Sequence, residues 1–500
     1  VDIALPPLTP GTYKLTFRVS AAGKSEGLVK TISVAGSRLT STNAQYSQVD
    51  AGDSWTSPAT TSTANVTLSD ASRGGWYPEL LGLSYADGNR SDQVMAAGEV
   101  ATLLAKYFGA PSTGPTGPSP SLDAYQKTGD GGVALLPYGG DDEVASAEAA
   151  ALNSSGIDRS DLITSFQALL AAKTTTAEEA TIALYGLAGL GQPVLPQLQA
   201  AVASGTLDPT ARLYAGLAAA ELGDLDLARS LYRGLLQQYG QAEGAMNRLE
   251  VDGVPDDVYL ASALAAELGA YLSDSHAAGF ELFVDANPSA TTSAAAEQVL
   301  FLRQYLPQLP AGDAQVSYSL DGAKTTTSLA GGSVTLHLTP GQLQGLHLRA
   351  GKGTVAITVS QQLPVTPATA KVDRTLSLQR SYSATNVAVG AVVNITLTYH
   401  LGAGALDGCY QVTDLLPSGL KALEDPFELG GDVLTATTPY AVVGQAVSFC
   451  ATKGTNGTGS ITYAALAVEP GTYLAEPATL QAQSAQQSLA FSGSTTVTIH

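Results

Sequence analysis

Residues 208–240 read DPTARLYAGLAAAELGDLDLARSLYRGLLQQYG and contain two amphipathic helices joined by a single residue. Asp208 and Pro209 are residue types favoured at the cap and in the first turn of a helix. Asp224 begins the second helix, in which leucines recur on one face until a glycine stops it. Because only Gly223 separates the two helices, they must fold back on each other as an antiparallel hairpin.

Helical spacing extends far beyond this hairpin. A long helix is predicted at residues 92–108, and after a Pro/Gly/Ser-rich loop at residues 110–121 helices follow one another to about residue 310. Helices in series form either an open solenoid or a closed α/α toroid. Residues 207–240 are similar to one tetratricopeptide repeat, but a solenoid needs about three copies at a fixed period and no second copy occurs. We therefore expect the toroid.

Strand-like sequence stands on both sides of the helices. Residues 1–37 alternate as strands, yet two or three strands cannot bury a core alone. Residues 64–69 give one further strand before the helices, and residues 315–359 give four short strands after them. Residues 372–500 have about seven strand runs separated by turn residues, the pattern of a β-sandwich. Neither set of strands next to the helices is complete as a domain. One small β-domain that is split by a helical insertion would explain both sets.

The predicted fold class is therefore multidomain α+β, with an α/α toroid inserted in a small β-domain and β-sandwiches on either side. The expected domains are the end of a β-sandwich at residues 1–37, the split β-domain at 38–70 and 312–365, the toroid at 71–311, and a terminal β-sandwich at 370–500.

The chain is acidic, with a formal net charge of −20 over its 500 residues. Nucleic acid requires a basic face, so it is excluded as a partner. The acidic residues are dispersed, the five histidines are scattered, and neither a P-loop nor His-x-x-x-His occurs, so we expect no metal and no small-molecule cofactor. No run of 18 uncharged apolar residues occurs, and a membrane anchor, if there is one, must lie outside this chain.

The two cysteines, Cys409 and Cys450, both lie in strand-like sequence of the last quarter. An intradomain disulfide is the favoured interpretation and implies an oxidising compartment. Two buried free thiols are the alternative, and neither cysteine has the histidine neighbour that a nucleophilic thiol needs. Val1 opens without the Met, charged segment and apolar segment of a signal peptide. We expect a piece of a longer protein that is extracellular, periplasmic or at the cell surface.

Short motifs in the last predicted domain carry a resemblance to a known family. Residues 380–382 (Arg-Ser-Tyr), Val389-Gly390 and residues 412–420 (Val-Thr-Asp-Leu-Leu-Pro-Ser-Gly-Leu) are similar to a series in the terminal macroglobulin domain of alpha-2-macroglobulins. That series is Arg-x-Tyr, Val-Gly-Asp and Val-x-Asp-x-Leu-Pro-Ala-Gly-Leu. In the second motif, Ala391 stands where the family has Asp. Residues 470–478 resemble the closing motif of the same domain.

Further motifs extend the resemblance over nearly the whole chain. Residues 8–13 and 28–34 are similar to the closing strands of the macroglobulin domain that precedes a CUB-type β-domain. Residues 126–132 and 136–140 resemble the Gln-x-x-Asp-Gly-Gly-Phe turn of terpenoid-cyclase-like toroids, with Val133 in the place of Phe. The resemblance is to the C-terminal half of bacterial alpha-2-macroglobulins. It implies macroglobulin-type sandwiches around a CUB-like β-domain that carries the toroid.

The family's toroid contains an internal thioester between the Cys and Gln of a Gly-Cys-x-Glu-Gln motif at the start of its first long helix. Residues 88–93 here read Gly-Asn-Arg-Ser-Asp-Gln and lack a cysteine. If Gln93 is matched to the family's Gln, Arg90 takes the place of Cys; if the glycines are matched, Asn89 does. Together with Asp92 these residues form a relict thioester position, at which the missing nucleophile excludes covalent capture. We expect a solvated helix N-terminus there, with Asp92 stabilised by the helix dipole.

Asp141, Asp142 and Glu143 suggest an enzymatic alternative. A glycosidase needs two carboxyl groups beside a cleft lined with aromatic residues to hold sugar. The helical block is instead rich in Ala and Leu, with no tryptophan after Trp76. Helix capping accounts for Asp141 and Asp142, so we expect no enzyme activity.

The resemblance thus implies a non-enzymatic protein without an internal thioester, which entraps or inhibits endopeptidases non-covalently after cleavage of a bait region upstream of Val1. Its partners would be proteases or other proteins. The alternative is a structural cell-surface scaffold, or an adhesion and assembly protein, that reuses the same domains. A long protease-labile segment before this chain would favour the trap, and a run of sandwich domains would favour the scaffold.

Overall fold

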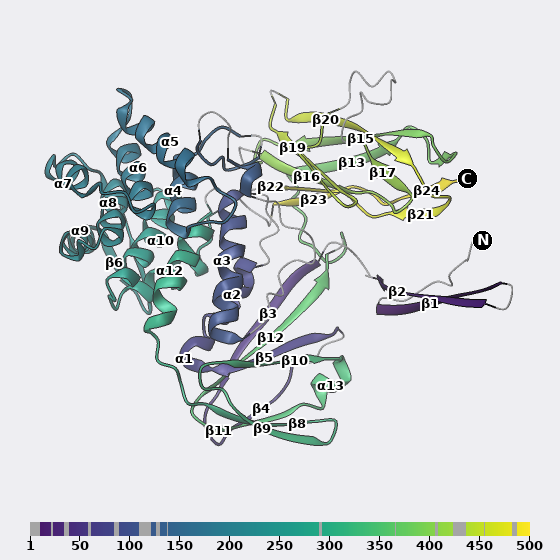
Figure 1. Cartoon of the computed structure of the whole chain (residues 1–500), viewed down its shortest axis with the longest axis horizontal. Helices are drawn as coiled ribbons and strands as arrows, with labels where there is room; N and C mark the ends of the chain where they lie inside the picture. The colour runs from purple at the N-terminus through teal and green to yellow at the C-terminus, as the bar shows by residue number, and fades with distance from the viewer. Residues whose placement is uncertain are drawn as a thin grey trace.

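The computed structural model of the chain contains a helical block and three groups of β-strands (Figure 1). Residues 8–10, 88–89, 127–130 and 138 of the sequence motifs lie outside the described part. The structure describes residues 11–21, 24–34, 40–58, 62–84, 90–109, 122–126, 131–137, 139–289, 293–365, 367–405, 409–423, 437–454, 456–482 and 488–500.

The first group is an antiparallel hairpin of β1 (Gly11–Ala21) and β2 (Lys24–Val34). The alternation expected for β1 is present, since Leu15 and Phe17 are partly buried and the residues between them are exposed. Phe17 stands opposite Leu28, and opposite residues of antiparallel strands share a face. Figure 1 shows this hairpin at the edge of the molecule on the side opposite the helical block.

The second group, the split β-unit, combines strands from before and after the helices. The preceding strands are β3 (Thr40–Val49), β4 (Ser54–Trp55) and β5 (Ala64–Asp70). The following elements are β8 (Gln315–Leu320), β9 (Ala323–Ser328), β10 (Ser333–Leu338), α13 (Pro340–Gln344), β11 (His347–Lys352) and β12 (Val355–Pro364). Two four-stranded sheets result, in the orders β10-β5-β12-β3 and β4-β11-β8-β9. Their facing side chains, among them Leu68 of β5 and Val316 of β8, share one buried cluster.

Between β5 and β8 the chain forms the helical block. Its long helices are α2 (Tyr77–Ser84), α3 (Ser91–Phe108), α4 (Glu143–Leu152), α5 (Arg159–Ala171), α6 (Ala177–Gly189), α7 (Leu195–Ala203), α8 (Pro209–Glu221), α9 (Leu225–Tyr239), α10 (Pro255–Tyr271), α11 (Ala277–Ala286) and α12 (Ala295–Tyr305). Its short elements are α1 (Ala71–Gly74), η1 (Leu122–Ala124), β6 (Gly240–Glu243), β7 (Met246–Leu249) and η2 (Leu306–Gln308). The helices α3, α4, α6, α8, α10 and α12 contact one another in this order, and α12 also contacts α3.

Local signals in the sequence explain where these helices begin. The Asp208 carboxylate accepts a hydrogen bond from the amide of Ala211 at 2.8 Å and caps α8. Asp224 caps α9 in the same way, and the intervening Gly223 has φ +80°, a left-handed conformation that favours glycine. The two helices predicted from residues 208–240 are therefore confirmed as α8 and α9, which contact each other.

Small residues allow the helices to approach closely. A Cβ atom on Gly186 of α6 would lie 2.2 Å from the ring of Phe166 on α5, and one on Gly216 of α8 would lie 2.6 Å from Leu268 on α10. Ala218 of α8 is completely buried. The Ala- and Gly-rich sequence thus reflects helices that are packed on most of their sides.

The third group is the C-terminal sandwich. Its strands are β13 (Leu376–Tyr382), β14 (Asn386–Val387), β15 (Val392–Leu401), β16 (Cys409–Leu415), β17 (Leu420–Ala422), β18 (Ala441–Val443), β19 (Ala446–Thr452), β20 (Thr458–Ala467), β21 (Gly471–Ala475), β22 (Thr479–Ala482), β23 (Leu489–Phe491) and β24 (Thr495–Ile499). They form sheets in the orders β13-β15-β20-β17, β18-β19-β16-β22-β23 and β14-β24-β21. Alternate residues of β15 point into the core, where Val393, Ile395 and Leu397 are completely buried.

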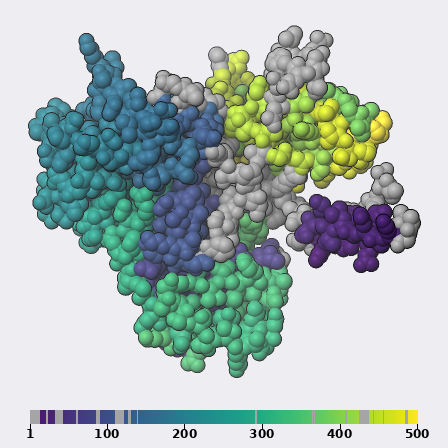
Figure 2. Space-filling view, in the orientation of Figure 1, coloured from purple at the N-terminus to yellow at the C-terminus, as the bar shows by residue number. Residues whose placement is uncertain are grey.

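The mixed α+β class predicted from the sequence is confirmed. Figure 2 shows the helical block on one side of the molecule, with the split β-unit and the C-terminal sandwich as separate masses beside it. Within the residues that the structure describes, no helix combines the length and the apolar character needed to span a bilayer.

Candidate functional site

The predicted relict thioester position falls at the start of α3. Arg90 is the residue before the first helical turn, with extended backbone at φ −80° and ψ 142° and no side-chain cap. The amide of Ser91 donates to the carbonyl of Leu135 at 2.9 Å, which ties the helix start to the motif segment at residues 131–137. Asn89 lies outside the described residues.

The start of α3 is buried. Ser91 is 0% exposed, Asp92 3% and Gln93 8%, so the expectation of a solvated helix N-terminus is wrong. Both α4 and α12 contact α3 and enclose it. These elements are remote in sequence, so local sequence at residues 88–93 gave no sign of the burial.

Arg90 and Asp92 form a bidentate ion pair at this position. Arg90 Nε lies 3.0 Å from one oxygen of Asp92, and Arg90 Nη2 lies 3.2 Å from the other. Although burial opposes the charge of the guanidinium, Asp92, Glu148 and Asp142 together raise the pKa of Arg90. A guanidinium that stays protonated is no nucleophile, so Arg90 cannot take over the reaction of a cysteine thiol.

Two buried carboxyl groups, Glu148 on α4 and Glu297 on α12, accompany this ion pair. Burial and then the neighbouring Glu297 raise the pKa of Glu148 well above its usual range. Burial likewise raises the pKa of Glu297 to about 7, with Asp92 contributing in the same direction. The two carboxyl groups act on each other in opposite directions: their mutual interaction raises the pKa of Glu148 and lowers that of Glu297, so the proton stays on Glu148.

A second carboxyl pair lies between α2 and α11. Burial and then Glu281 raise the pKa of Glu79 well above its usual range, and burial raises that of Glu281 to about 7. The side-chain amide of Gln298 donates to Glu281 at 2.9 Å. Because Gln298 follows Glu297 directly, the first turn of α12 contributes to both pairs.

A further buried glutamate, Glu267 on α10, accepts a hydrogen bond from the hydroxyl of Tyr185 at 2.8 Å. Nearby, the hydroxyl of Tyr214 has no hydrogen-bond partner, and burial raises its pKa well above the usual range. Burial and then Glu267 also raise the pKa of Tyr185 well above its usual range, so this hydroxyl keeps its proton. No group of three or more metal-ligating side chains is arranged to hold an ion within the described ranges.

Sequence reasoning missed these glutamates, although a signal was present. Glu148, Glu267 and Glu297 each stand within an alanine-rich helical run, with no Lys or Arg within four residues on either side. A lone carboxyl group on an otherwise apolar helix is buried with the rest of that helix, and it must then be neutral or paired.

The acidic triplet at residues 141–143 serves the local structure. Asp142 caps α4 by accepting from the amide of Ala145 at 2.9 Å, as expected. Asp141 does not cap a helix; it accepts from the amide of Gly132 at 3.2 Å, which corrects the expectation for this residue. Two members of the triplet thus hold the loop before α4 and the start of this helix.

The motif turn at residues 126–132 has an anchoring role. The side-chain amide of Gln126 donates to the carbonyls of Gly131 and Asp158, at 3.0 and 2.8 Å. Its side-chain oxygen accepts from the amide of Asp158 at 2.6 Å. Gln126 thereby fixes this turn to the start of α5.

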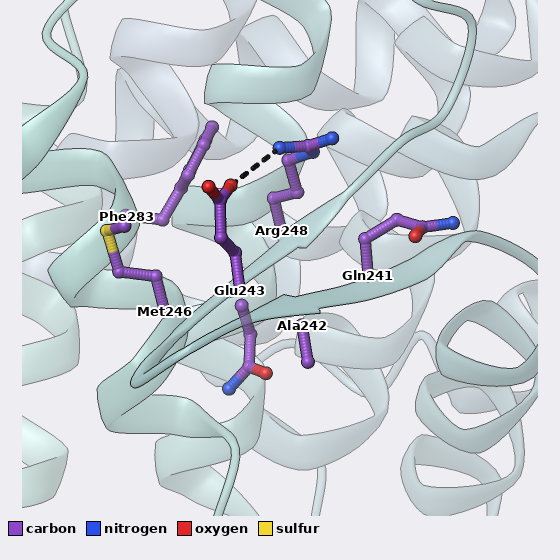
Figure 3. A pocket seen from close by; sticks show the side chains of 7 residues that line it. Gln241, Ala242, Glu243, Met246, Arg248 and Phe283 are labelled. Carbon is purple, nitrogen blue, oxygen red and sulfur yellow. Dashed lines mark hydrogen bonds and ion pairs between the residues drawn. The ribbon is translucent and has the colours of Figure 1, made fainter.

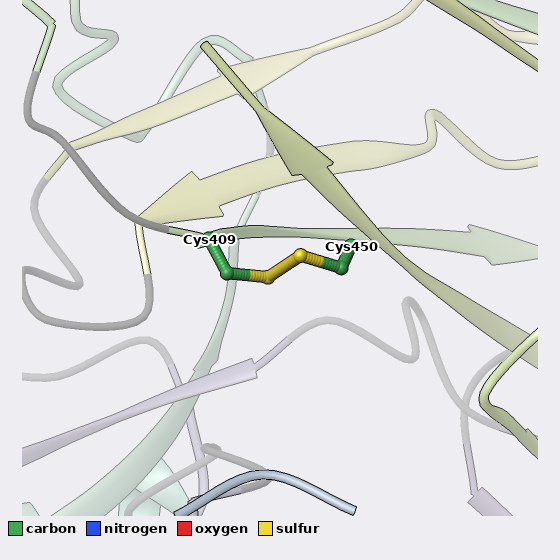
Figure 4. Close-up of a disulfide and its surroundings, with 2 residues drawn as sticks. All are labelled: Cys409 and Cys450. Atoms are coloured by element: carbon green, nitrogen blue, oxygen red, sulfur yellow. A yellow bond between two sulfur atoms is a disulfide. The ribbon is translucent and has the colours of Figure 1, made fainter. Parts of the chain in front are cut away.

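Cys409 and Cys450 are joined by a disulfide in the C-terminal sandwich (Figure 4). Their Cα atoms are 5.6 Å apart, within the range that a disulfide requires. The bond connects the adjacent strands β16 and β19. It stabilises one sandwich.

A small pocket of about 150 Å³ opens at the β6–β7 ribbon, an element that the sequence did not predict. Figure 3 shows Met246 next to Phe283, and Glu243 opposite Arg248. The last two form an ion pair with an N–O distance of 3.4 Å. This volume is below that of an ordinary ligand site, and the pocket holds none of the predicted site residues.

The described fold is similar to solved structures of bacterial alpha-2-macroglobulin. A native Escherichia coli fragment that spans domain MG7 to the C-terminus superposes with a TM-score of 0.65 and 15% identity, covering 99% of this chain and 88% of the fragment. The native E. coli protein superposes with a TM-score of 0.66 and 14% sequence identity, and the match covers 99% of this chain and 35% of the E. coli chain. The Salmonella protein reacted with methylamine superposes with a TM-score of 0.63 and 16% sequence identity, and the match covers 98% of this chain and 36% of the Salmonella chain.

The chain thus has the fold of the region from MG7 to the C-terminus, which confirms the resemblance drawn from the motifs. It spans about a third of the length of the larger E. coli and Salmonella chains, 35% and 36%. No protein-family model matches the sequence. No curated protein matches it either.

Proposed function

We propose that this chain is the C-terminal part of a thioester-lacking bacterial alpha-2-macroglobulin, which inhibits endopeptidases by non-covalent entrapment. One observation carries the proposal. The fold match extends over 99% of the chain, and the residues that we match to the family's position of covalent capture include the buried pair of Arg90 and Asp92. The scaffold of a protease trap is thus retained without the acylating group.

The domain division that we propose follows from the strand pairing. A CUB-like β-domain would comprise residues 38–70 and 312–365, because β12 pairs with both β3 and β5. An α/α toroid would occupy residues 71–311, and the contact of α12 with α3 supports a closed ring. Residues 1–37 would end one macroglobulin-like sandwich, and residues 370–500 would form another.

Trapping without a covalent bond has to rest on shape. The chain's two cysteines are joined to each other, so no thiol remains in it to form a thioester. A protease would then be retained by rearrangement of domains around it after bait cleavage, with no catalytic role for this chain. The disulfide favours an oxidising location, which we propose to be the periplasm, the cell surface or the medium.

The test uses the full-length protein that contains this chain and several endopeptidases of different specificity. We expect cleavage in one preferred segment, a decrease in the radius of gyration in small-angle scattering, and co-elution of the protease. The retained protease should still cleave a small chromogenic peptide while losing activity on a large protein substrate. Unchanged shape and free protease would overturn the proposal and favour the scaffold alternative.

Methylamine gives an independent test of the missing thioester. A thioester reacts with methylamine and releases a thiol, whereas this protein should keep its mass and release none. The Salmonella protein, whose structure was solved after reaction with methylamine, is the matched positive control. A mass increase corresponding to one methylamine would show that the proposal of a thioester-free inhibitor is wrong.

A further inference from the structure

We propose that Glu148 and Glu297 share one proton that fastens α4 to α12 beside the buried start of α3, and that loss of this proton loosens the contact. The pair would act as a proton-dependent clasp within the helical block. It is independent of any thioester chemistry and of the proposed protease trapping.

The geometry places the pair at a junction of three helices. The helices α3, α4 and α12 contact one another, and α12 is the helix that brings the end of the helical block back to α3. Glu148 is 6% exposed and Glu297 2%, so water does not screen their charges. A second link between the same helices is the hydrogen bond from Arg303 Nη2 on α12 to the carbonyl of Ala151 on α4, at 2.9 Å.

The charges around the pair are mostly negative. The titratable and charged groups that act on it or respond to it are Arg90 and Asp92 at the start of α3, Asp142 at the start of α4, Tyr214 on α8, and Tyr259 and Glu267 on α10. Arg90 is the cation of this group, and its guanidinium is already held by both oxygens of Asp92. A second negative charge on the pair would therefore lack a counter-charge.

The shared proton is what makes the contact favourable. With one proton, the two carboxyl groups form a short charge-assisted hydrogen bond and carry a single negative charge. Without it, two carboxylates face each other away from water, which costs both the hydrogen bond and the desolvation of a second charge. Both side chains have an oxygen without any other partner, so nothing else would offset the loss.

Stability depends on pH because the folded chain keeps the proton to a higher pH than the unfolded chain does. An unfolded glutamate releases its proton near pH 4.3, whereas burial raises the pKa of Glu297 to about 7 in the fold. Between these values the folded chain binds more protons than the unfolded chain, so stability falls as the pH rises. The pair releases its first proton, that of Glu297, near neutral pH, and the clasp opens at higher pH, where the shared proton on Glu148 is lost.

The first experiment observes the protons directly by carbon-13 NMR of the full chain labelled in its glutamate carboxyl groups. We expect resonances that titrate near or above neutral pH, and Glu148→Gln and Glu297→Gln should each remove one and shift the other. Since the wild-type titration alone is informative, the test does not depend on the variants folding. Titration of every glutamate below about pH 5.5 would overturn the proposal.

The second experiment measures the unfolding equilibrium constant between about pH 5 and pH 7. The unfolding equilibrium constant of the wild type should rise with pH. For Glu297→Gln it should rise less steeply, by a factor of roughly ten per pH unit, because this variant lacks one proton-binding group. Glu243→Gln is the matched control, because this carboxyl group is in the same block with its side chain 75% exposed. Parallel pH curves for the wild type and Glu297→Gln would contradict the clasp.

Discussion

Arg380 and Asp414 form an ion pair that is completely buried in the C-terminal sandwich. Arg380 Nη1 lies 2.5 Å from an oxygen of Asp414, and both side chains are 0% exposed. The hydroxyl of Tyr463 donates to the other carboxylate oxygen at 2.8 Å, and Arg380 also donates to the carbonyl of Ala475 at 3.2 Å. The Arg-x-Tyr and Val-x-Asp motifs of the sequence are thus the two halves of one contact.

Replacing Asp414 with Ala should destabilise the C-terminal sandwich strongly. The substitution leaves the guanidinium of Arg380 buried without a counter-charge, and loss of one partner from such a pair costs about 3–5 kcal/mol of unfolding free energy. Denaturant unfolding of the full chain, followed by circular dichroism, measures the effect. The control is Asp313→Ala, since Asp313 pairs with Lys352 at 2.5 Å but both side chains are more than 60% exposed, at 67% and 64%. We expect that change to cost under about 1 kcal/mol, and equal losses from the two variants would contradict the argument.

The features that the sequence predicted correctly depend on nearby residues. Asp208, Asp142 and Asp224 cap helices because the acceptor and its amide are only three residues apart, so the pattern is complete within one turn. The alternation of β1 and the order of strand-rich and helix-rich segments are likewise readable over short windows.

The features that it missed depend on residues brought together from afar. The start of α3 was expected to be solvated, yet it is covered by α4 and α12 and bonded to Leu135. The shared proton of Glu148 and Glu297 likewise requires two helices far apart in sequence. The apolar surroundings of each glutamate signal burial, but only the packing of the helices shows which carboxyl group it meets.

Adding a methyl group at Gly186 should destabilise the helical block. In Gly186→Ala the new Cβ would lie 2.2 Å from the ring of Phe166, which forces α5 and α6 apart at a cost of about 1–3 kcal/mol. The control is Gly234→Ala on α9, where nothing lies within 4 Å of the new atom. That change should leave the protein as stable or raise its stability by up to about 1 kcal/mol, because alanine favours a helix. Thermal unfolding of both variants distinguishes the close contact from a general effect of glycine replacement.

Replacing Arg90 at the predicted relict thioester position should destabilise the fold, because Asp92 loses its counter-charge. In Arg90→Met the side chain of Asp92, which is 4% exposed, loses its partner, at a cost of about 3–5 kcal/mol. Adding Asp92→Asn should recover most of this loss, because a neutral amide no longer requires a counter-charge. Denaturant unfolding of the two single variants and the double variant forms the cycle that measures the coupling. Additive losses would show that the two side chains act independently.

The carboxyl pair of Glu79 and Glu281 should contribute a second pH dependence. Burial raises the pKa of Glu281 to about 7, above the value of roughly 4.3 for an unfolded glutamate, so this group stabilises the fold fully in acid. Its contribution falls as the pH rises through 7, because the folded chain then releases the proton that the unfolded chain lost earlier. Glu281→Gln should therefore flatten the dependence of the melting temperature on pH between about 5 and 8. Glu243→Gln is again the exposed control, with the wild-type slope expected. A slope for Glu281→Gln that equals the wild-type slope would show that Glu281 is ionised throughout, with the amide of Gln298 sufficient to hold its charge.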